Sequence, residues 1–152
     1  RERDQRFILH CDLNGFYASV ECLYNPGIRH LPVAVTGDPA ARTGIVLAKN
    51  QAAKKYKIQT GEAIWQAKQK CPNLVCVSAD HKLYAYYSNL FRSILSDYSD
   101  RVESFGLDEA WVDISGPGMN WKRAHKIANQ IRYRAWSELG LTASIGLSWN
   151  KP

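Results

Sequence analysis

The amino-acid sequence predicts an α+β fold of the split β-α-β, ferredoxin-like type, interrupted by a small α/β insertion. Once residues 25–80 are set aside, short apolar runs and longer stretches of helical periodicity follow one another in the order β-α-β-β-α-β. The residues set aside form a second pattern of short strands and short helices, separated by glycine and proline. These two observations predict one domain with a smaller α/β part inserted into it.

One strand and one helix precede the insertion. The apolar run at residues 7–11 predicts a buried strand that ends at the carboxylate of Asp12. Asn14 is a suitable cap for a helix over residues 15–24. The apolar face of this helix is expected to hold Phe16, Val20 and Leu23.

Inside the insertion, we expect strands at residues 32–36, 45–48 and 74–77, and helices at residues 50–57 and 62–70. After the insertion, apolar residues keep helical spacing without a break from Lys82 to Tyr98.

The last part of the chain completes the outer pattern. Two strands are expected at residues 101–106 and 109–114, and they are joined almost directly. A Gly-Pro-Gly loop then leads into a long helix, which Gly140 ends, and a closing strand follows at residues 142–148. The helix carries Trp121, Ala124, Ala128, Ile131 and Ala135 at helical spacing.

Composition and charge narrow the class of protein. Hydrophobic residues make up 45% of the 152 residues and charged residues 22%, which is ordinary for a soluble globular protein. Twenty lysines and arginines against 14 acidic residues give a net charge of +6, which favours anionic partners. No run of about 18 apolar residues exists, and the charged N-terminus lacks the apolar stretch of a secretion signal.

The cysteines do not form a metal-binding or disulfide pattern. Cys11, Cys22, Cys71 and Cys76 include no CxxC pair and have no second pair of ligands at zinc-site spacing. We therefore expect buried free thiols in a reducing cytosol.

Three carboxylates are expected to meet at one edge of the predicted sheet. Right-handed crossovers make the first and second outer strands parallel, with the third strand between them and antiparallel to both. Asp12 at the end of the first strand then lies beside Asp108 and Glu109, in the hairpin that joins the second and third strands. Clustered carboxylates repel one another, and hard divalent cations such as Mg²⁺ relieve that repulsion. Taken singly, each residue is more simply a turn or strand-end residue, and the joint placement favours a two-metal site for phosphoryl transfer.

Three segments resemble motifs of the Y-family (lesion-bypass) DNA polymerases, the ImpB/MucB/SamB or UmuC-like family. Asp12 to Glu21 (DLNGFYASVE) is similar to an aspartate followed by an aromatic pair and A-x-V-E. Ser104 to Asp113 (SFGLDEAWVD) resembles the S-x-D-E-A-x-x-D hairpin, and Ser144 to Lys151 (SIGLSWNK) matches S-x-G-x-S-x-N-K. The segments occur in family order and cover nearly the whole chain, with the greatest similarity to the DinB (DNA polymerase IV) branch.

The resemblance implies template-directed addition of deoxynucleotides to a primer 3′ end, tolerant of damaged template. Asp12, Asp108 and Glu109 would be the catalytic carboxylates on a polymerase palm. They would ligate two Mg²⁺ ions together with the carbonyl of Leu13, and Glu109 would lie near the primer 3′-hydroxyl.

The resemblance also implies residues that bind the incoming nucleotide. Tyr17 would be the steric gate against a ribose 2′-hydroxyl, although its spacing alone fits a core residue equally well. The implied nucleotide-binding residues are Phe16, Tyr17, Gln51, Lys54 and Lys151.

The sequence departs from the family at the phosphate-binding segment. Many members have T-x-x-Y-x-x-R after the second fingers strand, where this chain has Ala48, Gln51 and Lys54. A hydroxyl and a phenol are thus lost, and a forked guanidinium becomes a point charge. The pattern Asn50-x-x-Ala53-Lys54 is instead similar to the UmuC branch.

The resemblance divides the chain into palm, at residues 1–24 and 82–152, and fingers, at residues 25–81. Family members continue into thumb and little-finger domains that hold the duplex, so we expect this segment alone to be inactive. The implied partners are primer-template DNA and deoxynucleoside triphosphates, with a sliding clamp contacted through segments outside this sequence. We expect a cytoplasmic monomer with no membrane association.

Three other functions are weighed against this one. An RNA-recognition module would need aromatic residues without acidic ones on its central strands, whereas the third outer strand combines Trp111 with Glu109 and Asp113. A nucleotide cyclase on a similar sheet would carry a G-G-acidic-acidic-F hairpin, which is absent here. A non-catalytic relative would not need to keep all three carboxylates.

Overall fold

The computed structural model describes residues 5–38 and 44–150. By their internal contacts, the described residues form two compact units. The first unit contains the chain up to Asn14 and from Ala85 onward, and the second runs from Gly15 to Tyr84. This division groups residues 15–24 with the insertion, whereas the expected palm boundary included them. None of the helices in the described ranges is long and apolar enough to cross a membrane.

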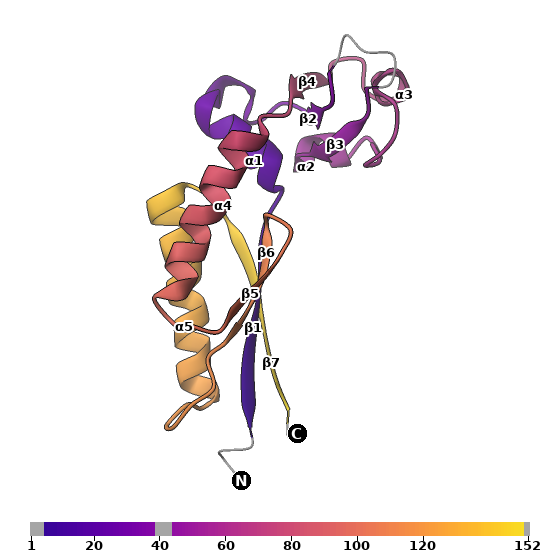
Figure 1. The fold of residues 1–152 in the computed structure, drawn as a ribbon. Helices are drawn as coiled ribbons and strands as arrows, with labels where there is room; N and C mark the ends of the chain where they lie inside the picture. The colour runs from indigo at the N-terminus through magenta and orange to yellow at the C-terminus, as the bar shows by residue number, and fades with distance from the viewer. Residues whose placement is uncertain (1–4, 39–43, 151–152) are drawn as a thin grey trace. The chain divides into compact units, whose positions relative to one another are not determined.

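The first unit is built on a four-stranded antiparallel sheet in the order β5-β6-β1-β7 (Figure 1). Its strands are β1 (Arg6–Leu13), β5 (Val102–Phe105), β6 (Glu109–Asp113) and β7 (Ala143–Asn150). Because β6 is antiparallel to both of its neighbours, β1 and β5 run in the same direction with β6 between them. The predicted strand order is therefore confirmed.

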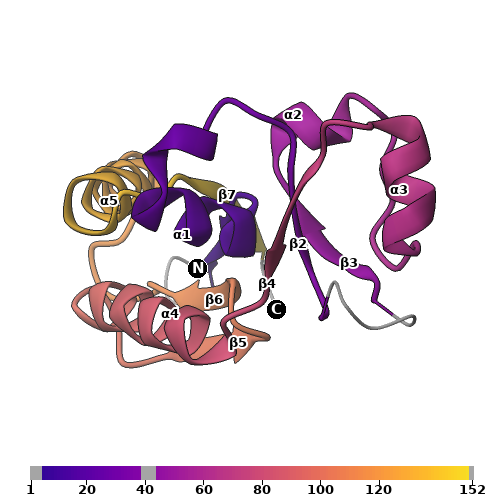
Figure 2. The ribbon, with the colours of Figure 1, turned by 90° about the horizontal axis from the view of Figure 1, so that it is seen from above.

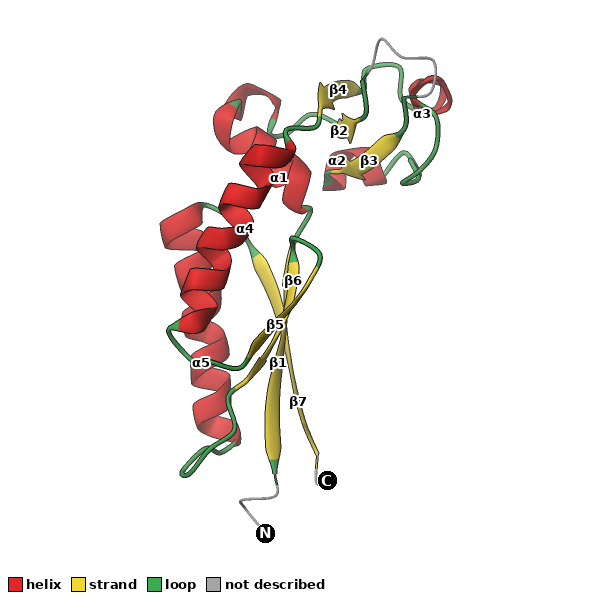
Figure 3. Cartoon of the chain, in the orientation of Figure 1, coloured by secondary structure: helices red, strands yellow, loops and turns green. Residues whose placement is uncertain are grey.

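Two helices, α4 (His81–Ser96) and α5 (Trp121–Arg134), lie on the same side of this sheet (Figures 1 and 3). Burial along β1 alternates, as expected for a sheet with one covered face: Leu9 is 0% exposed and His10 is partly exposed. The buried side chains of the strands and helices include Phe7, Leu9, Cys11, Leu13, Phe91, Ile94, Leu95, Ala110, Val112, Ala124, Ala128 and Ile131.

The start and the end of α5 follow from particular residues. The Asn120 side chain accepts a hydrogen bond from the Arg123 N–H at 2.9 Å, which caps the first turn. The helix continues into a π-helical turn (Ala135–Leu139) and ends at Gly140, whose φ of 71° lies in the left-handed region. The predicted end at Gly140 is confirmed, and the π-turn was not predicted.

The second unit contains a three-stranded mixed sheet in the order β3-β2-β4, which can be followed in Figure 2. The strands are β2 (Val33–Thr36), β3 (Val46–Lys49) and β4 (Val75–Ser78), and β2 runs antiparallel to β3 and parallel to β4. The helices are α1 (Phe16–Tyr24), a 3-10 turn (Pro26–Ile28), α2 (Gln51–Lys54) and α3 (Ile64–Lys70). Their core consists of Ala34, Val46, Ala53, Ile58, Ala67, Cys71 and Leu74.

Three local expectations were wrong. Asn14 does not cap α1, because its side chain bonds Thr142, just before β7, and Ser144 on β7, and the cap position is taken by Gly15 with φ 49°. Leu23 is 37% exposed and does not join the buried face of α1. The helix expected at residues 50–57 ends at Lys54.

All four cysteines are free thiols, as expected. Cys11 and Cys71 are also buried, whereas the partial exposure of Cys22 and Cys76 was not expected. Burial raises the pKa of the Cys11 thiol to about 12, although the nearby charge of Arg132 opposes the shift.

Asp113, at the end of β6, is held by a group of polar contacts in the first unit. Its carboxylate accepts hydrogen bonds from the Ser115 N–H at 2.9 Å and from Arg6 at 3.0 Å, and Arg101 lies 3.9 Å away. Burial alone would raise the pKa of this carboxyl group. The hydrogen bonds from Ser115 and Arg6 and the charge of Arg101 outweigh burial and hold the pKa below its usual value. The last aspartate of the hairpin motif thus has a structural role.

We expect Asp113→Asn to lower the free energy of unfolding at pH 7 by on the order of 2 kcal/mol, since it removes charge-assisted bonds from a buried carboxylate. A carboxyl whose folded pKa is depressed stabilises the fold above its unfolded pKa and loses that effect as the pH falls through the folded pKa. The difference between variant and wild type should therefore shrink in acid. Urea unfolding at several pH values measures it, with the exposed Asp100→Asn as control. Equal urea midpoints at pH 7 would contradict the assigned role.

Candidate active site

The ends of β1 and β6 bring the three predicted carboxylates to one edge of the sheet in the first unit. Asp12 lies directly opposite Glu109 in the β1–β6 register. The next backbone N–H, that of Leu13, donates to the carbonyl of Asp108 at 2.9 Å. The predicted meeting of residues nearly a hundred positions apart is thus confirmed.

The turn that carries Asp108 is held by a glycine within it and by hydrogen bonds from α4 and β1. Gly106 has a φ of 67°, which glycine adopts without strain, so the chain can reverse between β5 and β6. The carbonyl of Leu107 accepts a hydrogen bond from the buried hydroxyl of Ser88 on α4 at 2.6 Å. Together with the bond from Leu13, this contact holds the turn in one position against the sheet.

Burial and neighbouring negative charge raise the pKa of Asp12 and of Asp108. For Asp12, burial is the larger cause, and the charges of Asp108 and Glu109 add to it. For Asp108, burial and the charge of Glu109 raise the pKa, and a hydrogen bond from its own backbone N–H opposes them. No lysine or arginine in the described part of the chain forms an ion pair with any of the three. Among the described residues, the edge is therefore a cluster of negative charge without a counterion.

The donor chemistry at this edge fits a hard divalent cation. The three carboxylates and the Leu13 carbonyl offer only oxygen donors, and Mg²⁺ prefers oxygen ligands. Within residues 5–38 and 44–150, no three His, Cys, Asp or Glu side chains are grouped closely enough to hold a metal by themselves. Since Mg²⁺ usually keeps several waters and shares substrate phosphates, an incomplete protein ligand set is compatible with this ion.

Beside the carboxylates, the open face of the sheet carries a hollow of about 400 Å³ with aromatic walls. The Trp111 ring lies between His10 at 4.5 Å and Phe105 at 5.2 Å, measured between ring centroids. Asp12 and Glu109 line the same hollow. Sequence reasoning did not assign His10 or Phe105 to the site. The alternation of β1 could have identified His10, which shares a face with Asp12.

On the other side of Asp12, the segment of β7 that begins at Ser144 places small residues. In the β1–β7 register, Asp12 lies opposite Ser144, and His10 lies opposite Gly146. Both β7 residues are exposed, and a Cβ atom added to Gly146 would meet nothing within 4 Å. Packing within the chain therefore does not require glycine at position 146, and Ser144 and Gly146 leave the β7 side of Asp12 free of bulky side chains.

In the second unit, Tyr17 is held by a group of aromatic rings. Its ring stacks on Tyr84, with centroids 4.2 Å apart and planes 14° from parallel, and meets His81 edge-on at 6.1 Å. Tyr84 is fully buried, and its hydroxyl donates to Glu21 at 2.6 Å. Tyr17 itself is partly exposed, whereas Phe16 is only 3% exposed. Of the predicted aromatic pair, Tyr17 is therefore the residue with surface to offer a substrate.

Sequence reasoning did not identify Tyr84. Burial and the hydrogen bond to Glu21 both raise the pKa of its hydroxyl, so Tyr84 stays protonated and keeps donating that bond. In the sequence it is one of several aromatic residues at helical spacing, and it lies far from Tyr17 along the chain.

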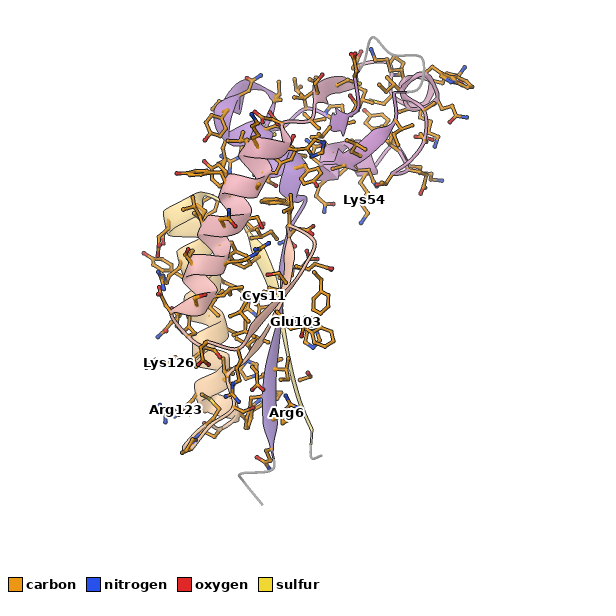
Figure 4. All side chains as sticks on the ribbon, in the orientation of Figure 1. Arg6, Cys11, Lys54, Glu103, Arg123 and Lys126 are labelled. Carbon is orange, nitrogen blue, oxygen red and sulfur yellow. The ribbon has the colours of Figure 1, made fainter. Side chains whose placement is uncertain are left out.

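The predicted phosphate-binding residues lie on and before α2. The side chain of Asn50 caps this helix by accepting from the Ala53 N–H at 2.9 Å, and it also bonds Leu31 and Val33. Gln51 and Lys54 are exposed (Figure 4 labels Lys54). Ala48 is partly exposed on β3. Lys151, the remaining predicted contact, lies outside the described residues.

Comparisons with a family model and with known proteins point to the same family. The model of the impB/mucB/samB family matches residues 11–152. The DNA polymerase IV of Acetivibrio thermocellus is 59% identical over 147 residues, which are 97% of this chain and 37% of that protein. The DNA polymerase IV of Dehalococcoides mccartyi is 38% identical over 146 residues, covering 96% of this chain and 37% of that protein. The chain thus spans little more than a third of these relatives.

Among solved structures, DinB from Sulfolobus solfataricus superposes with a TM-score of 0.88 at 24% identity. The match covers 93% of this chain and 42% of that one. This likeness supports the described fold.

We expect Asp108→Asn to raise the melting temperature at neutral pH in the presence of EDTA. A carboxyl group whose pKa is raised in the folded protein lowers the stability of the fold when the pH exceeds that pKa and the group ionises. Replacing it with an uncharged amide should therefore raise the stability most at pH values above that pKa. A relief of about 1 kcal/mol corresponds to a shift of a few degrees. The gain should fade in acid, where the wild-type carboxyl is protonated.

Thermal melts across pH measure this effect, and Glu103→Gln, an exposed carboxylate change on β5, is the control. A variant that melts below the wild type at neutral pH would show that Asp108 is stabilised in the fold, contrary to the charge cluster described above.

Proposed function

This chain belongs to the impB/mucB/samB family, and on that premise we propose that it is the catalytic segment of a template-directed, translesion DNA polymerase. Its reaction would add deoxynucleotides to a primer 3′ end. The observation that carries the proposal is the meeting of Asp12, Asp108 and Glu109 at one edge of the sheet. The family resemblance of all three segments supports it.

In this proposal, the three carboxylates hold two Mg²⁺ ions, and the carbonyl of Leu13 is a further ligand. The bound ions would neutralise phosphate charge and stabilise the attacking and leaving oxygens of an in-line displacement. Asp12 and Asp108 contribute ligand oxygens from positions fixed by β-pairing and by the turn. Glu109 is exposed beside the aromatic hollow, where it would lie next to the primer 3′-hydroxyl.

We propose that the primer end binds in the aromatic hollow. Trp111 is 47% exposed and Phe105 40% exposed, and both line the hollow together with the carboxylates. A nucleotide combines a flat aromatic base with an anionic phosphate. Aromatic rings beside a cation-binding edge match both parts of it.

Tyr17 is proposed to select the sugar of the incoming nucleotide. Its stacking on the buried Tyr84 ring, whose hydroxyl is tied to Glu21, restricts its freedom to move aside. A ring held in this way can exclude a 2′-hydroxyl by steric contact. The same contacts explain how a partly exposed tyrosine keeps one position without being a core residue.

Lys54 and Gln51 are proposed to contact the triphosphate, with Lys151 as a further cation. Lys54 is exposed, and no described residue forms an ion pair with it, so its charge is available to a ligand. A single ammonium is a point charge and lacks the forked geometry of arginine. We therefore propose a looser phosphate contact than the T-x-x-Y-x-x-R pattern would provide.

We propose that the first unit corresponds largely to the palm and the second to the fingers, within the expected boundaries of residues 1–24, 82–152 and 25–81. The partners would be primer-template DNA and deoxynucleoside triphosphates. A cytoplasmic location, a monomeric state and a clamp contact outside this segment complete the proposal.

In a full-length polymerase that contains this chain, Asp108→Ala or Glu109→Ala should lower primer extension by more than the 10²–10³ that typically follows the loss of one electrostatic contact. Extension of a labelled primer with Mg²⁺ measures the loss, and Glu103→Ala is the matched carboxylate control. GTP alone serves as the substrate control for a cyclase. Near-native extension by Asp108→Ala would rule out the proposed role of the carboxylates.

Tyr17→Ala in the same protein should admit ribonucleotides while deoxynucleotide incorporation stays measurable, because the side chain that excludes the 2′-hydroxyl is gone. The ratio of UTP to dTTP incorporation measures this effect. Tyr24→Ala is the control, since Tyr24 is on the same helix and is 60% exposed. If the ratio is the same in the Tyr17 variant and the wild type, Tyr17 acts only in packing.

A further inference from the structure

A second hollow, of about 610 Å³, follows α5 in the first unit and takes no part in the proposed reaction. We call it the α5 groove, and its lining includes Tyr98, Lys122, His125, Lys126, Tyr133 and Arg134. Figure 4 labels Lys126 and Arg123 on α5, on the side away from the strands. The buried face of α5, with Ala124, Ala128 and Ile131, meets the core instead.

The charge of α5 has one sign. Residues 121–134 contain five lysines and arginines and no aspartate or glutamate. The arginines are engaged within the fold: Arg134 bonds Asp97 at 2.8 Å and Glu138 at 2.6 Å, and Arg132 bonds the Ile145 carbonyl at 3.0 Å.

The two lysines of α5 differ from its arginines, because no described residue pairs with them. Lys122 and Lys126 lie one helical turn apart and line the groove, and neither forms an ion pair with a described residue. Their charges do not contribute to holding the fold together and are free to bind an anion.

Aromatic rings lie among these cations. Tyr133 in the groove is 69% exposed, and Trp121 and Trp136, at the two ends of the helical segment, are 49% and 51% exposed. The Trp121 ring meets His125 edge-on at 4.8 Å, and the Arg134 guanidinium lies 5.8 Å from the centre of the Tyr98 ring. Tyr133 is the large exposed ring that lines the groove together with Lys122 and Lys126, and an exposed apolar ring of this kind indicates a binding surface.

We propose that the α5 groove is a second binding site, for single-stranded nucleic acid, separate from the carboxylate edge. Lys122 and Lys126 contact successive phosphates, and Tyr133 stacks on a base. Cations that follow a backbone, combined with aromatic rings, are the features by which proteins bind single strands without reading their sequence. An acidic protein segment would use the lysines but leave Tyr133 without a stacking partner, so the nucleic acid fits more of the surface.

The two sites lie on opposite faces of one sheet. The groove belongs to a helix that packs on the covered face, and the aromatic hollow lies on the open face. A strand bound to α5 is therefore not the strand whose end lies at Asp12. The proposal does not need the carboxylates to be catalytic.

The test measures binding of a fluorescent oligothymidine of about 16 nucleotides to the full-length protein by anisotropy, over a range of salt concentrations. Lys122→Glu with Lys126→Glu should weaken binding at least about tenfold. It should also lower the slope of log K against log salt by about 1.4, since two phosphate contacts are lost.

Tyr133→Ala should weaken binding about tenfold, and Tyr133→Phe, which keeps the ring, should not.

The matched control is Arg29→Glu with Lys68→Glu, which changes the net charge equally at two exposed positions outside the groove. Equal losses in the α5 and control variants would overturn the proposal, because the effect would then be one of overall charge. Competition by polyglutamate as strong as that by unlabelled oligothymidine would overturn it in favour of an acidic protein partner.

Two further measurements separate this proposal from the polymerase assignment. The α5 double variant should extend a saturating primer-template at the wild-type rate, and Asp108→Ala should bind oligothymidine as the wild type does. Loss of oligothymidine binding in Asp108→Ala would overturn the claim of two separate sites, whatever the outcome of the extension assay.

Discussion

The pairing of β1 with β6 determines where every carboxylate of the candidate site lies. Side chains on a strand alternate between the two faces of a sheet, so a slip of one residue would turn Asp12 from the open face into the core under the helices. The apolar residues Leu9, Cys11 and Leu13 oppose such a slip because each of them is buried on the covered face. The same register that packs the core thus sets Asp12 opposite Glu109.

Charge is distributed unevenly over the first unit. The carboxylate edge gathers negative charge that no described lysine or arginine pairs with, although the chain as a whole carries +6. Asp113 shows the opposite arrangement one strand length away, where Arg6, Arg101 and Ser115 satisfy a single carboxylate. The fold therefore neutralises the aspartate that supports structure. It leaves unpaired the carboxylates that we propose to bind cations, at a cost in stability that functional sites commonly show.

Much of this organisation could be predicted from the sequence. Periodicity and chain order gave the strand order of the first unit, and the handedness of crossovers placed Asp12 beside Asp108 and Glu109. The sequence could not predict which of several possible hydrogen-bond partners a polar side chain would choose. Asn14 is a good helix cap by type, yet its amide bonds Thr142 and Ser144, more than a hundred residues away in the sequence.

Side-chain neighbours across long sequence distances were also beyond prediction. Helical spacing predicted the helix that contains Tyr84 but could not show that the Tyr84 ring would support Tyr17. Likewise, the exposure of Phe105 and Trp111 could not be predicted, because the alternation of a strand places polar residues on the open face and these two are large apolar ones.

The division of the chain into two units has an evolutionary consequence. The first unit is discontinuous, since it is interrupted after Asn14 and resumes at Ala85. The contacts described above that position Asp12, Asp108 and Glu109 lie within it: the β1–β6 pairs, the Leu13 bond to Asp108 and the Ser88 bond to Leu107. Because long insertions add little closure entropy, residues 15–84 can gain, lose or exchange sequence while the carboxylates keep their places. Lineages can therefore diversify the inserted unit by mutation or recombination without rebuilding the ancestral sheet.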